Sequence, residues 1–329
     1  MTKLSSTCHN EHLLDRAAML AMRGILALQP EAKFGPDARP AFDTLMERTP
    51  AADDVEYVQA EVGGVAGWWC RPDRAIPGVA ILYLHGGAYV AGSATAYRHF
   101  VGQIAARTGI ATFIADYGLA PERPFPAAVH DAQSAYRGMA DAGYRRIALA
   151  GDSAGGGLTL VLLAEATAQA REGRYPRPLG AVAMSPWADL TLSGASMETR
   201  ASADPLLSQA TLDAAASLYV GAADRGDPLI SPIFGDLSGL PPVCLHVGED
   251  EILLDDARRY AERLAAAGGY AELNVWKGMV HVFPANVAML RGAVEALDDV
   301  GRFLRALLGL KCVRPTRPRD NMSPNPNLS

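Results

Sequence analysis

Short apolar runs alternate with longer segments of helical periodicity along most of the chain, which predicts an α/β protein. Several runs from Val79 onward are continuously apolar, as strands buried on both faces of a parallel sheet are. Helix-length segments separate them, apart from one longer irregular stretch between Ser185 and Val243. Eight strands are expected, at residues 55–60, 65–70, 79–84, 110–115, 146–150, 181–185, 243–247 and 272–276.

The first two of these runs lie too close together for a crossover helix, so we expect them to pair antiparallel at one edge of the sheet. Helices between the other strands would cover both faces of a mostly parallel sheet. The irregular stretch contains a helical pattern at residues 207–220. We expect this stretch to be the place where a segment that covers the sheet is inserted.

The first fifty residues are predicted to be helical. Leu14, Ala18, Met22 and Ile25 recur at helical spacing, and a second short helix is expected at residues 41–48. Because these helices precede the first expected strand, we expect them to cover the sheet domain, either as packing at one edge or as a roof over a site.

The composition is that of an ordinary globular protein with one large domain. The 329 residues are 49% hydrophobic with a net charge of −6, and the body of the chain has no basic clusters, which disfavours nucleic acid or an anionic membrane as partner. A small neutral or apolar ligand fits better. The chain has no signal-peptide pattern and no run of about 18 apolar residues, so a cytoplasmic protein is expected.

The four cysteines, Cys8, Cys70, Cys244 and Cys312, are widely spread. No Cys-x-x-Cys pair and no His/Cys spacing of a zinc site occurs. We therefore expect neither a structural metal nor a disulfide framework.

A Gly-Asp-Ser-Ala-Gly motif at residues 151–155 lies between a strand-like run and a helical pattern. Gly-x-Ser-x-Gly is typical of a sharp strand-to-helix turn that presents a nucleophilic serine, here Ser153. The first amides of the following helix, including that of Ala154, would point at negative charge forming beside the serine. A chance match is the alternative in a chain with 32 glycines, but the flanking strand and helix favour the nucleophile.

A serine nucleophile needs a base, and that base needs an orienting acid. Of seven histidines, His281 follows the last expected strand across a turn, and loops beyond the carboxyl ends of parallel strands carry the sites of α/β sheets. A packed loop histidine is the alternative. The acid is expected among Glu249, Asp250 and Glu251, which follow the preceding strand, although a merely solvated turn would have the same sequence. The order serine, acid, histidine is that of the α/β-hydrolases.

A His-Gly-Gly-Ala-Tyr segment at residues 85–89 directly follows an apolar strand. Its two glycines would let backbone N–H groups approach an oxyanion, so Gly86 and Gly87 are expected to form an oxyanion hole together with Ala154. His85 is expected to hold the loop rather than transfer protons. The glycines lack the sequence register of a phosphate-binding loop.

With these motifs in order, the chain resembles the hormone-sensitive-lipase family of α/β-hydrolases, bacterial carboxylesterases with a His-Gly-Gly-Gly motif upstream of Gly-Asp-Ser-Ala-Gly. The resemblance runs from about residue 79 to 283 and includes the segments at 116–122, 124–128 and 185–190. Two departures are small: Ala88 replaces the third glycine, and Gly118 stands where arginine is usual.

The resemblance implies an α/β-hydrolase fold with a helical cap built from residues 1–47 and 189–225. The catalytic domain would comprise residues 48–188 and 226–310, and residues 311–329 are expected to form a disordered tail because they are rich in proline without apolar periodicity. The family often forms homodimers and hydrolyses esters with short to medium acyl chains without a cofactor.

The resemblance also favours one acid. In the family the triad acid is followed by leucine two residues later and by a second acidic residue four later. Glu251 has Leu253 and Asp255 in those places, whereas Asp250 does not match and stays the alternative.

The predicted function is a serine carboxylesterase acting on a small-molecule ester, with Ser153, Glu251 and His281 as its triad and no metal or cofactor. One rival is a deacetylase or amide hydrolase that acts on a particular metabolite with the same triad. The other is a non-catalytic receptor on the same fold, like the plant gibberellin receptors, which lack the base. The presence of His281 disfavours the receptor.

Overall fold

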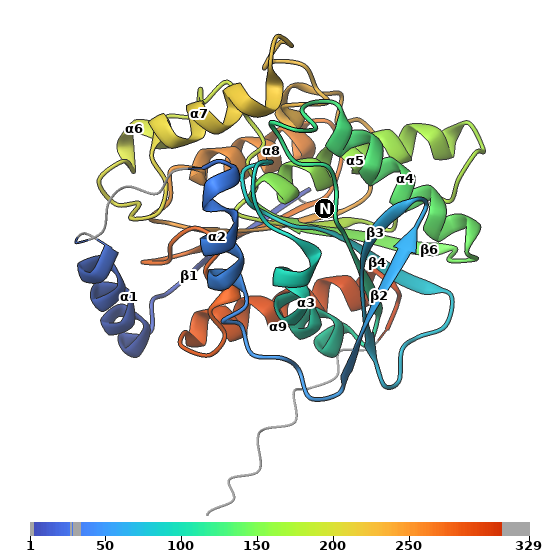
Figure 1. Cartoon of the computed structure of the whole chain (residues 1–329), viewed down its shortest axis with the longest axis horizontal. Coiled ribbons are helices and arrows are strands. Elements are labelled where there is room, and N and C mark those ends of the chain that lie inside the picture. The colour runs from blue at the N-terminus through green and yellow to red at the C-terminus, as the bar shows by residue number, and fades with distance from the viewer. Residues whose placement is uncertain (1–2, 27, 29–33, 311–329) are drawn as a thin grey trace, which may run out of the picture.

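The computed structural model of the chain describes residues 3–26, 28 and 34–310, and the expected tail at 311–329 lies outside them. A nine-stranded sheet forms its centre, with strand order β1-β9-β8-β7-β6-β4-β5-β3-β2 (Figure 1). The strands are β1 (Leu4–His9), β2 (Val55–Val62), β3 (Val65–Pro72), β4 (Val79–Leu84), β5 (Ala111–Ala115), β6 (Arg146–Asp152), β7 (Ala181–Met184), β8 (Val243–Gly248) and β9 (Ala271–Trp276).

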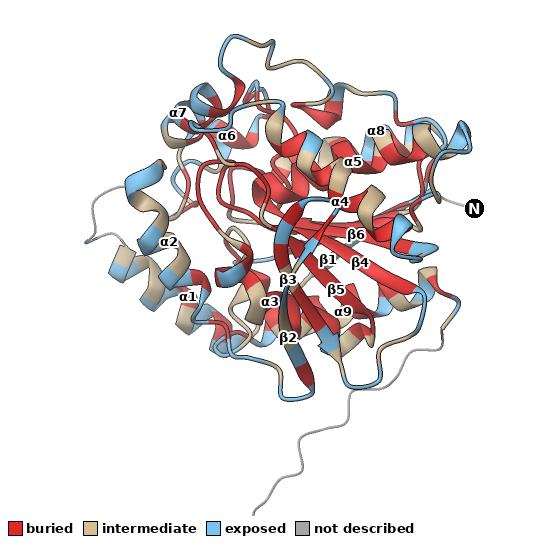
Figure 2. Cartoon of the chain, turned by 45° about the vertical axis from the view of Figure 1, so that its right-hand side comes forward, coloured by how far each residue is buried: buried red, intermediate tan, exposed pale blue. Residues whose placement is uncertain are grey.

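Strands β2 to β9 correspond one by one to the eight runs expected from the sequence. The hairpin β2–β3 is antiparallel and joins the sheet by antiparallel pairing of β3 with β5, while β4 to β9 are parallel to one another. Every residue of β4 is buried, because helices cover both faces of the sheet (Figure 2). The predicted mostly parallel sheet with an antiparallel edge is confirmed.

Strand β1 was not expected, so the prediction of eight strands and of a wholly helical N-terminal segment was wrong. The strand pairs parallel with β9, from Leu4 opposite Ala271 to His9 opposite Trp276. Four of its six residues are exposed, because it lies at the edge of the sheet and is held mainly through its backbone. At its end, the His9 ring stacks on Trp276 at 3.7 Å between centroids.

Two groups of helices cover the sheet. Helices α4, α5 and α8 pack in the core on one face, and α3 and α9 pack in the core on the other. The helices are α1 (Leu13–Leu26), α2 (Arg39–Met46), α3 (Ala94–Thr108), α4 (Ala127–Asp141), α5 (Ser153–Arg171), α6 (Ser196–Thr199), α7 (Gln209–Val220), α8 (Leu254–Ala266) and α9 (Arg291–Leu307), with 3-10 turns at Pro36–Ala38, Pro232–Phe234 and Phe283–Ala285.

Helices α1, α2, α6 and α7 lie on the same side of the molecule in both ribbon views (Figures 1 and 2). The first two precede β2, and the other two belong to the stretch between β7 and β8, in which the structure has no strand. Helix α7 begins after a capping box at Ser208 and covers most of the expected 207–220 pattern.

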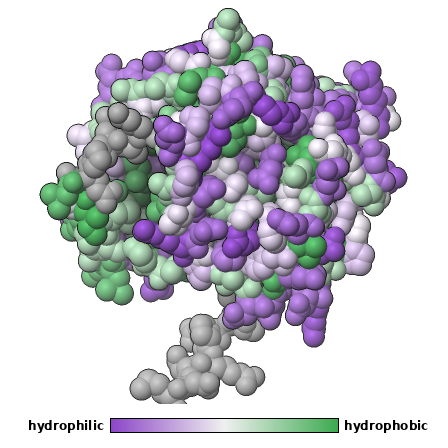
Figure 3. All heavy atoms as spheres, viewed as in Figure 1, coloured by the Kyte–Doolittle hydropathy of each residue, from purple (hydrophilic) through white to green (hydrophobic). Residues whose placement is uncertain are grey.

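Helix α1 forms where the sequence predicts it, but a polar side chain attaches it to the rest of the protein. The carboxylate of Asp15 is buried and accepts N–H groups of Arg291 and Gly292, at 2.9 and 2.7 Å, where α9 begins. Leu14 and Ile25, by contrast, are 84% and 61% exposed. Apolar side chains of α1 therefore face outward, at the left of Figure 3.

Candidate active site

Ser153 lies at the turn between β6 and α5, as the Gly-x-Ser-x-Gly motif predicts. Its φ of +53° is in the left-handed region, which a residue with a side chain adopts only under strain. The next glycine is required by close packing, because a Cβ at Gly155 would lie 2.1 Å from the carbonyl oxygen of Leu84. The turn thus holds the start of α5 closely against the end of β4.

Three predicted residues meet in one chain of hydrogen bonds. His281 Nε2 lies 2.9 Å from Ser153 Oγ, and His281 Nδ1 lies 2.9 Å from Glu251 Oε2. Glu251 follows β8 and is fully buried, while the His281 side chain follows β9 and is 10% exposed. The loops beyond the carboxyl ends of adjacent parallel strands bring these groups together.

Asp250, the alternative acid, does not contact His281. Its Oδ2 lies 2.7 Å from Arg23 Nη2 on α1, and Arg23 also donates a hydrogen bond to the carbonyl oxygen of Ala203. The two neighbouring carboxylates therefore face different partners.

The environment of His281 favours its protonated form. Burial alone would lower the pKa of His281, but the hydrogen bond and the charge of Glu251 outweigh burial, and its pKa is raised above the usual 6.5. An imidazole with this balance accepts a proton readily from a neighbouring hydroxyl group.

The loop after β4 runs against the nucleophile, but one of its expected donors is already used. Gly86 N donates to Asp152 Oδ1 at 3.1 Å, so this amide is not free for an oxyanion. A Cβ at Gly86 would lie 3.1 Å from the Cβ of Ser153, which shows how closely the loop approaches. Gly87 has φ +118°, and Ala88 has φ +55°. The amide of Ala154 lies in the first turn of α5, where N–H groups lack intrahelical acceptors.

His85 supports this loop, as the sequence suggested. Its ring is buried, its Nδ1 lies 2.8 Å from the carbonyl oxygen of Gly86, and it stacks on Tyr117. Tyr117 Oη donates to the carbonyl oxygen of His85 at 2.6 Å, and Ala120 N donates to that of Tyr89 at 2.9 Å. The segment after β5 therefore supports the loop after β4.

Asp152 is a residue of the site that sequence reasoning missed. Its buried carboxylate accepts hydrogen bonds from Tyr83 and Tyr97 at 2.7 and 3.0 Å, in addition to Gly86. Burial, partly offset by these hydrogen bonds, raises the pKa of Asp152 to about 6. The side chain links the turn of Ser153 to the loop after β4. Its position inside the motif was the only signal in the sequence.

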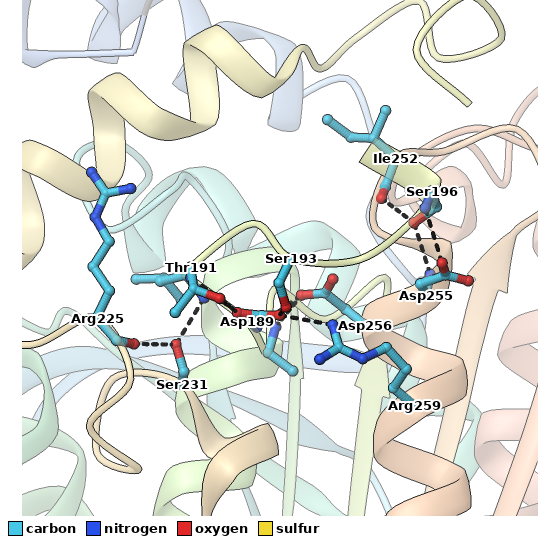
Figure 4. Close-up of polar contacts among 12 residues, drawn as sticks. Asp189, Thr191, Ser193, Ser196, Arg225, Ser231, Ile252, Asp255, Asp256 and Arg259 are labelled. Atoms are coloured by element: carbon cyan, nitrogen blue, oxygen red, sulfur yellow. Dashed lines mark hydrogen bonds and ion pairs between the residues drawn. The ribbon is translucent and has the colours of Figure 1, made fainter. Parts of the chain in front are cut away.

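The stretch after β7 is fastened to α8 by buried polar contacts (Figure 4). Asp256 Oδ2 accepts the N–H groups of Ala188 and Asp189, both at 2.8 Å, and Arg259 Nη1 lies 2.8 Å from Asp189 Oδ2. Because α8 begins three residues after Glu251, these contacts attach the stretch after β7 to the helix that follows the Glu251 loop.

Among the described residues, no group of three or more His, Cys, Asp or Glu side chains is arranged to hold a metal ion. Cys8, Cys70 and Cys244 are free thiols, and Cys312 lies outside the described residues. In the same part of the chain, no helix is both long and apolar enough to cross a bilayer.

Comparisons with known proteins identify the family of the chain. Residues 81–285 match a family described as alpha/beta hydrolase fold. An acetyl-hydrolase of Streptomyces hygroscopicus is 40% identical over 250 residues, 75% of this chain and 82% of that protein. An esterase of Acinetobacter venetianus is 32% identical over 290 residues, 87% of this chain and 94% of that protein. The crystal structure of a hormone-sensitive lipase from a metagenome library is 37% identical, with a TM-score of 0.84 over 91% of this chain and 99% of that one.

Proposed function

The chain belongs to the hormone-sensitive-lipase family of α/β-hydrolases and is a carboxylic ester hydrolase, and from this premise we propose that Ser153, His281 and Glu251 are its catalytic triad. The continuous hydrogen-bonded chain from Ser153 Oγ through the imidazole to Glu251 Oε2 carries the proposal. Strain at Ser153 supports it, because strained residues cluster at active sites.

In the first half of the reaction, Ser153 Oγ attacks the ester carbonyl carbon while His281 Nε2 takes the hydroxyl proton. The carbonyl oxygen becomes an oxyanion, and the carboxylate of Glu251 stabilises the imidazolium. The tetrahedral intermediate collapses when the carbon–oxygen bond to the alcohol breaks, and Nε2 returns its proton to the departing alcohol oxygen. An acyl-enzyme on Ser153 remains.

In the second half, water attacks the acyl carbon, and His281 takes one proton from that water. The intermediate then releases the carboxylic acid, and Ser153 Oγ regains its proton from the imidazolium. No external oxidant, reductant or cofactor enters the balance of either half.

The oxyanion donors that we propose are the amides of Gly87 and Ala154. The sequence suggested Gly86 as a third donor, but its amide serves Asp152. Gly86 is instead needed for the close approach of the loop to Ser153, since a side chain there would meet the Asp152 carboxylate at 2.3 Å.

We also propose that residues 10–47 and 189–225 form the cap, while residues 4–9 belong to the sheet as β1. Ser153 is only 9% exposed, and a confined site of this kind favours small esters with short to medium acyl chains. The relative from Streptomyces hygroscopicus is named an acetyl-hydrolase, which favours acetyl esters among the substrates and keeps a metabolite deacetylase as the alternative. Homodimer formation and a cytoplasmic location stay predictions.

The proposal is tested with p-nitrophenyl butyrate and an alkyl phosphonate that reacts with serine nucleophiles. We expect the phosphonate to abolish hydrolysis and to modify one peptide, the one that contains Ser153, as measured by mass spectrometry. Inactivation with the modification on another residue would contradict the assignment. Parallel assays with p-nitrophenyl acetate and p-nitroacetanilide compare ester with amide cleavage.

A further inference from the structure

Ser185 is a strained, buried residue next to the proposed triad. It directly follows β7, is fully buried, and has a φ of +46°. Its backbone N–H donates to the carbonyl oxygen of His246 on β8 at 2.6 Å. A residue with a side chain keeps a left-handed conformation only where its surroundings impose it, and such residues cluster at functional sites.

The hydroxyl group of Ser185 lies between the Glu251 carboxylate and the backbone next to His281. Ser185 Oγ lies 2.9 Å from Glu251 Oε1, and Val282 N donates to Ser185 Oγ at 3.0 Å. The other carboxylate oxygen, Oε2, is the one bonded to His281. One hydroxyl group thus links the triad acid to the residue that directly follows the triad histidine.

The direction of each hydrogen bond is determined by the partners. An amide N–H only donates, so Ser185 Oγ accepts from Val282. An ionised carboxylate only accepts, so the hydroxyl proton is directed at Glu251. Gly248 N also donates to Oε1, at 2.5 Å. Two donors therefore hold one carboxylate oxygen and leave Oε2 turned toward the imidazole.

The turn after His281 depends on the same hydroxyl. Val282 has φ +50°, so the chain bends sharply at the residue after the base. Removing the hydroxyl group would leave the Val282 amide without this acceptor and would take one donor from the buried Glu251 carboxylate, and losing a hydrogen bond to a buried charged group is costly.

We propose that Ser185 is a positioning residue of the triad. Its hydroxyl group holds the Glu251 carboxylate and the turn after His281 in fixed positions relative to each other. The inference rests on the proposed triad and adds a residue to it. Ser185 does not touch the reacting atoms, so its effect passes through the bond between Glu251 and His281.

The test compares Ser185→Ala and Ser185→Gly with a matched control, Ser196→Ala. Ser196 is also a buried serine and begins α6, from which it hydrogen-bonds to the loop that carries Glu251. Its Oγ donates to the carbonyl oxygen of Ile252 and accepts from Asp255 N at 3.0 Å, but it forms no hydrogen bond to Ser153, His281 or Glu251. Ser185→Gly removes the hydroxyl group and also relieves the left-handed strain. This variant therefore still tests the role of the hydroxyl group if Ser185→Ala unfolds the protein.

We expect kcat for p-nitrophenyl butyrate to fall about ten- to a hundredfold in both Ser185 variants, as for loss of a hydrogen bond to a charged group. KM should change by less than about twofold, and the acidic limb of kcat/KM should move to lower pH, because a looser Glu251 supports the imidazolium less. Ser196→Ala should keep kcat within about twofold of wild type even where its Tm falls.

A folded Ser185→Gly protein with wild-type kcat would overturn the proposal, and so would an equal loss of kcat in Ser196→Ala. Glu251→Gln is measured in parallel to separate the two levels of inference. Loss of kcat in Glu251→Gln with normal kcat in the Ser185 variants removes only the role of Ser185. Normal kcat in Glu251→Gln removes the triad and the role of Ser185 with it.

Discussion

The guanidinium group of Arg123 occupies the space beside Gly118, where a Cβ would lie 2.8 Å from Arg123 Cζ. Arg123 forms a two-point ion pair with Asp131, at 2.7 and 3.0 Å, and the same carboxylate accepts Gly118 N at 2.8 Å. The family resemblance puts an arginine at position 118. In this chain, glycine at 118 makes room for a guanidinium group that comes from five residues further along.

A double-mutant cycle at these two positions should be strongly non-additive. Gly118→Ala displaces the Arg123 guanidinium, and Arg123→Ala removes it, so each change alone should cost about 1 kcal/mol of unfolding free energy because the ion pair is partly exposed. The double variant should cost no more than either single change. Chemical denaturation measures all four proteins, and additive losses would show that the two positions do not share this space.

The triad acid should be Glu251. Asp250 is paired with Arg23, whereas Glu251 lies against His281. Glu251→Gln should lower kcat on the order of 10⁴-fold, and Asp250→Asn should stay within about tenfold of wild type. Arg23→Gln is the control for the lost ion pair and should match Asp250→Asn. A dead Asp250→Asn with an active Glu251→Gln would reverse the assignment.

Ser153→Ala should abolish esterase activity and leave the fold intact. The serine side chain is small and lies in a turn whose geometry depends on the flanking glycines, so Tm should change little. The loss of kcat should exceed about 10⁴-fold, since other parts of a triad cannot replace the nucleophile. Initial rates with p-nitrophenyl butyrate and circular dichroism melting test both statements. Activity within about tenfold of wild type would refute the nucleophile.

The pH dependence should follow His281. The base must be neutral to accept the serine proton, and its pKa is raised, so kcat/KM should fall as the pH drops through a value above 6.5. Glu251→Gln removes the largest influence that raises the pKa of His281, so the acidic limb of the residual activity should move to lower pH.

The same shift makes stability depend on pH. A histidine whose pKa is higher in the folded protein contributes stability that is complete below 6.5 and is lost as the pH rises through the raised value. The Tm of the wild-type protein should therefore fall as the pH rises from 6.5 through the raised pKa of His281. In Glu251→Gln the loss should be smaller, and identical slopes in the two proteins would contradict the linkage.

Acyl chains of about two to eight carbons should be preferred, because each CH₂ adds binding only while the site can bury it. The value of kcat/KM should rise and then fall along a series of p-nitrophenyl esters. Olive-oil hydrolysis that increases sharply once the oil forms a separate phase would contradict a compact cap.

The strands with apolar runs could be predicted because a strand buried on both faces of the sheet needs consecutive apolar residues. Strand β1 has no such apolar run. Its residues are mostly polar and exposed, and its pairing with β9 depends on backbone groups that every sequence has. Ser153, His281 and Glu251 were found from motifs and register.

The partners of the Gly86 amide and of the Ser185 hydroxyl group could not be predicted. Gly86 and Ser185 each bond a residue 66 positions away, and those distances are set by the packed strands and by positive φ angles rather than by local sequence. Asp152 and Ser185 each lie inside a family motif, but the motif does not indicate which residues their side chains bond.

The pairing of β1 with β9 also has a consequence for synthesis of the chain. His9 and Asn274 are 265 residues apart, so β1 leaves the ribosome long before the strand that it joins. Until β9 follows, the edge of β8 and the backbone of β1 are both open to other strands. A nascent chain that stalls between β8 and residue 271 therefore carries an unpaired β1 and one open edge of β8, and these are the points at which we expect a chaperone to bind or aggregation to begin.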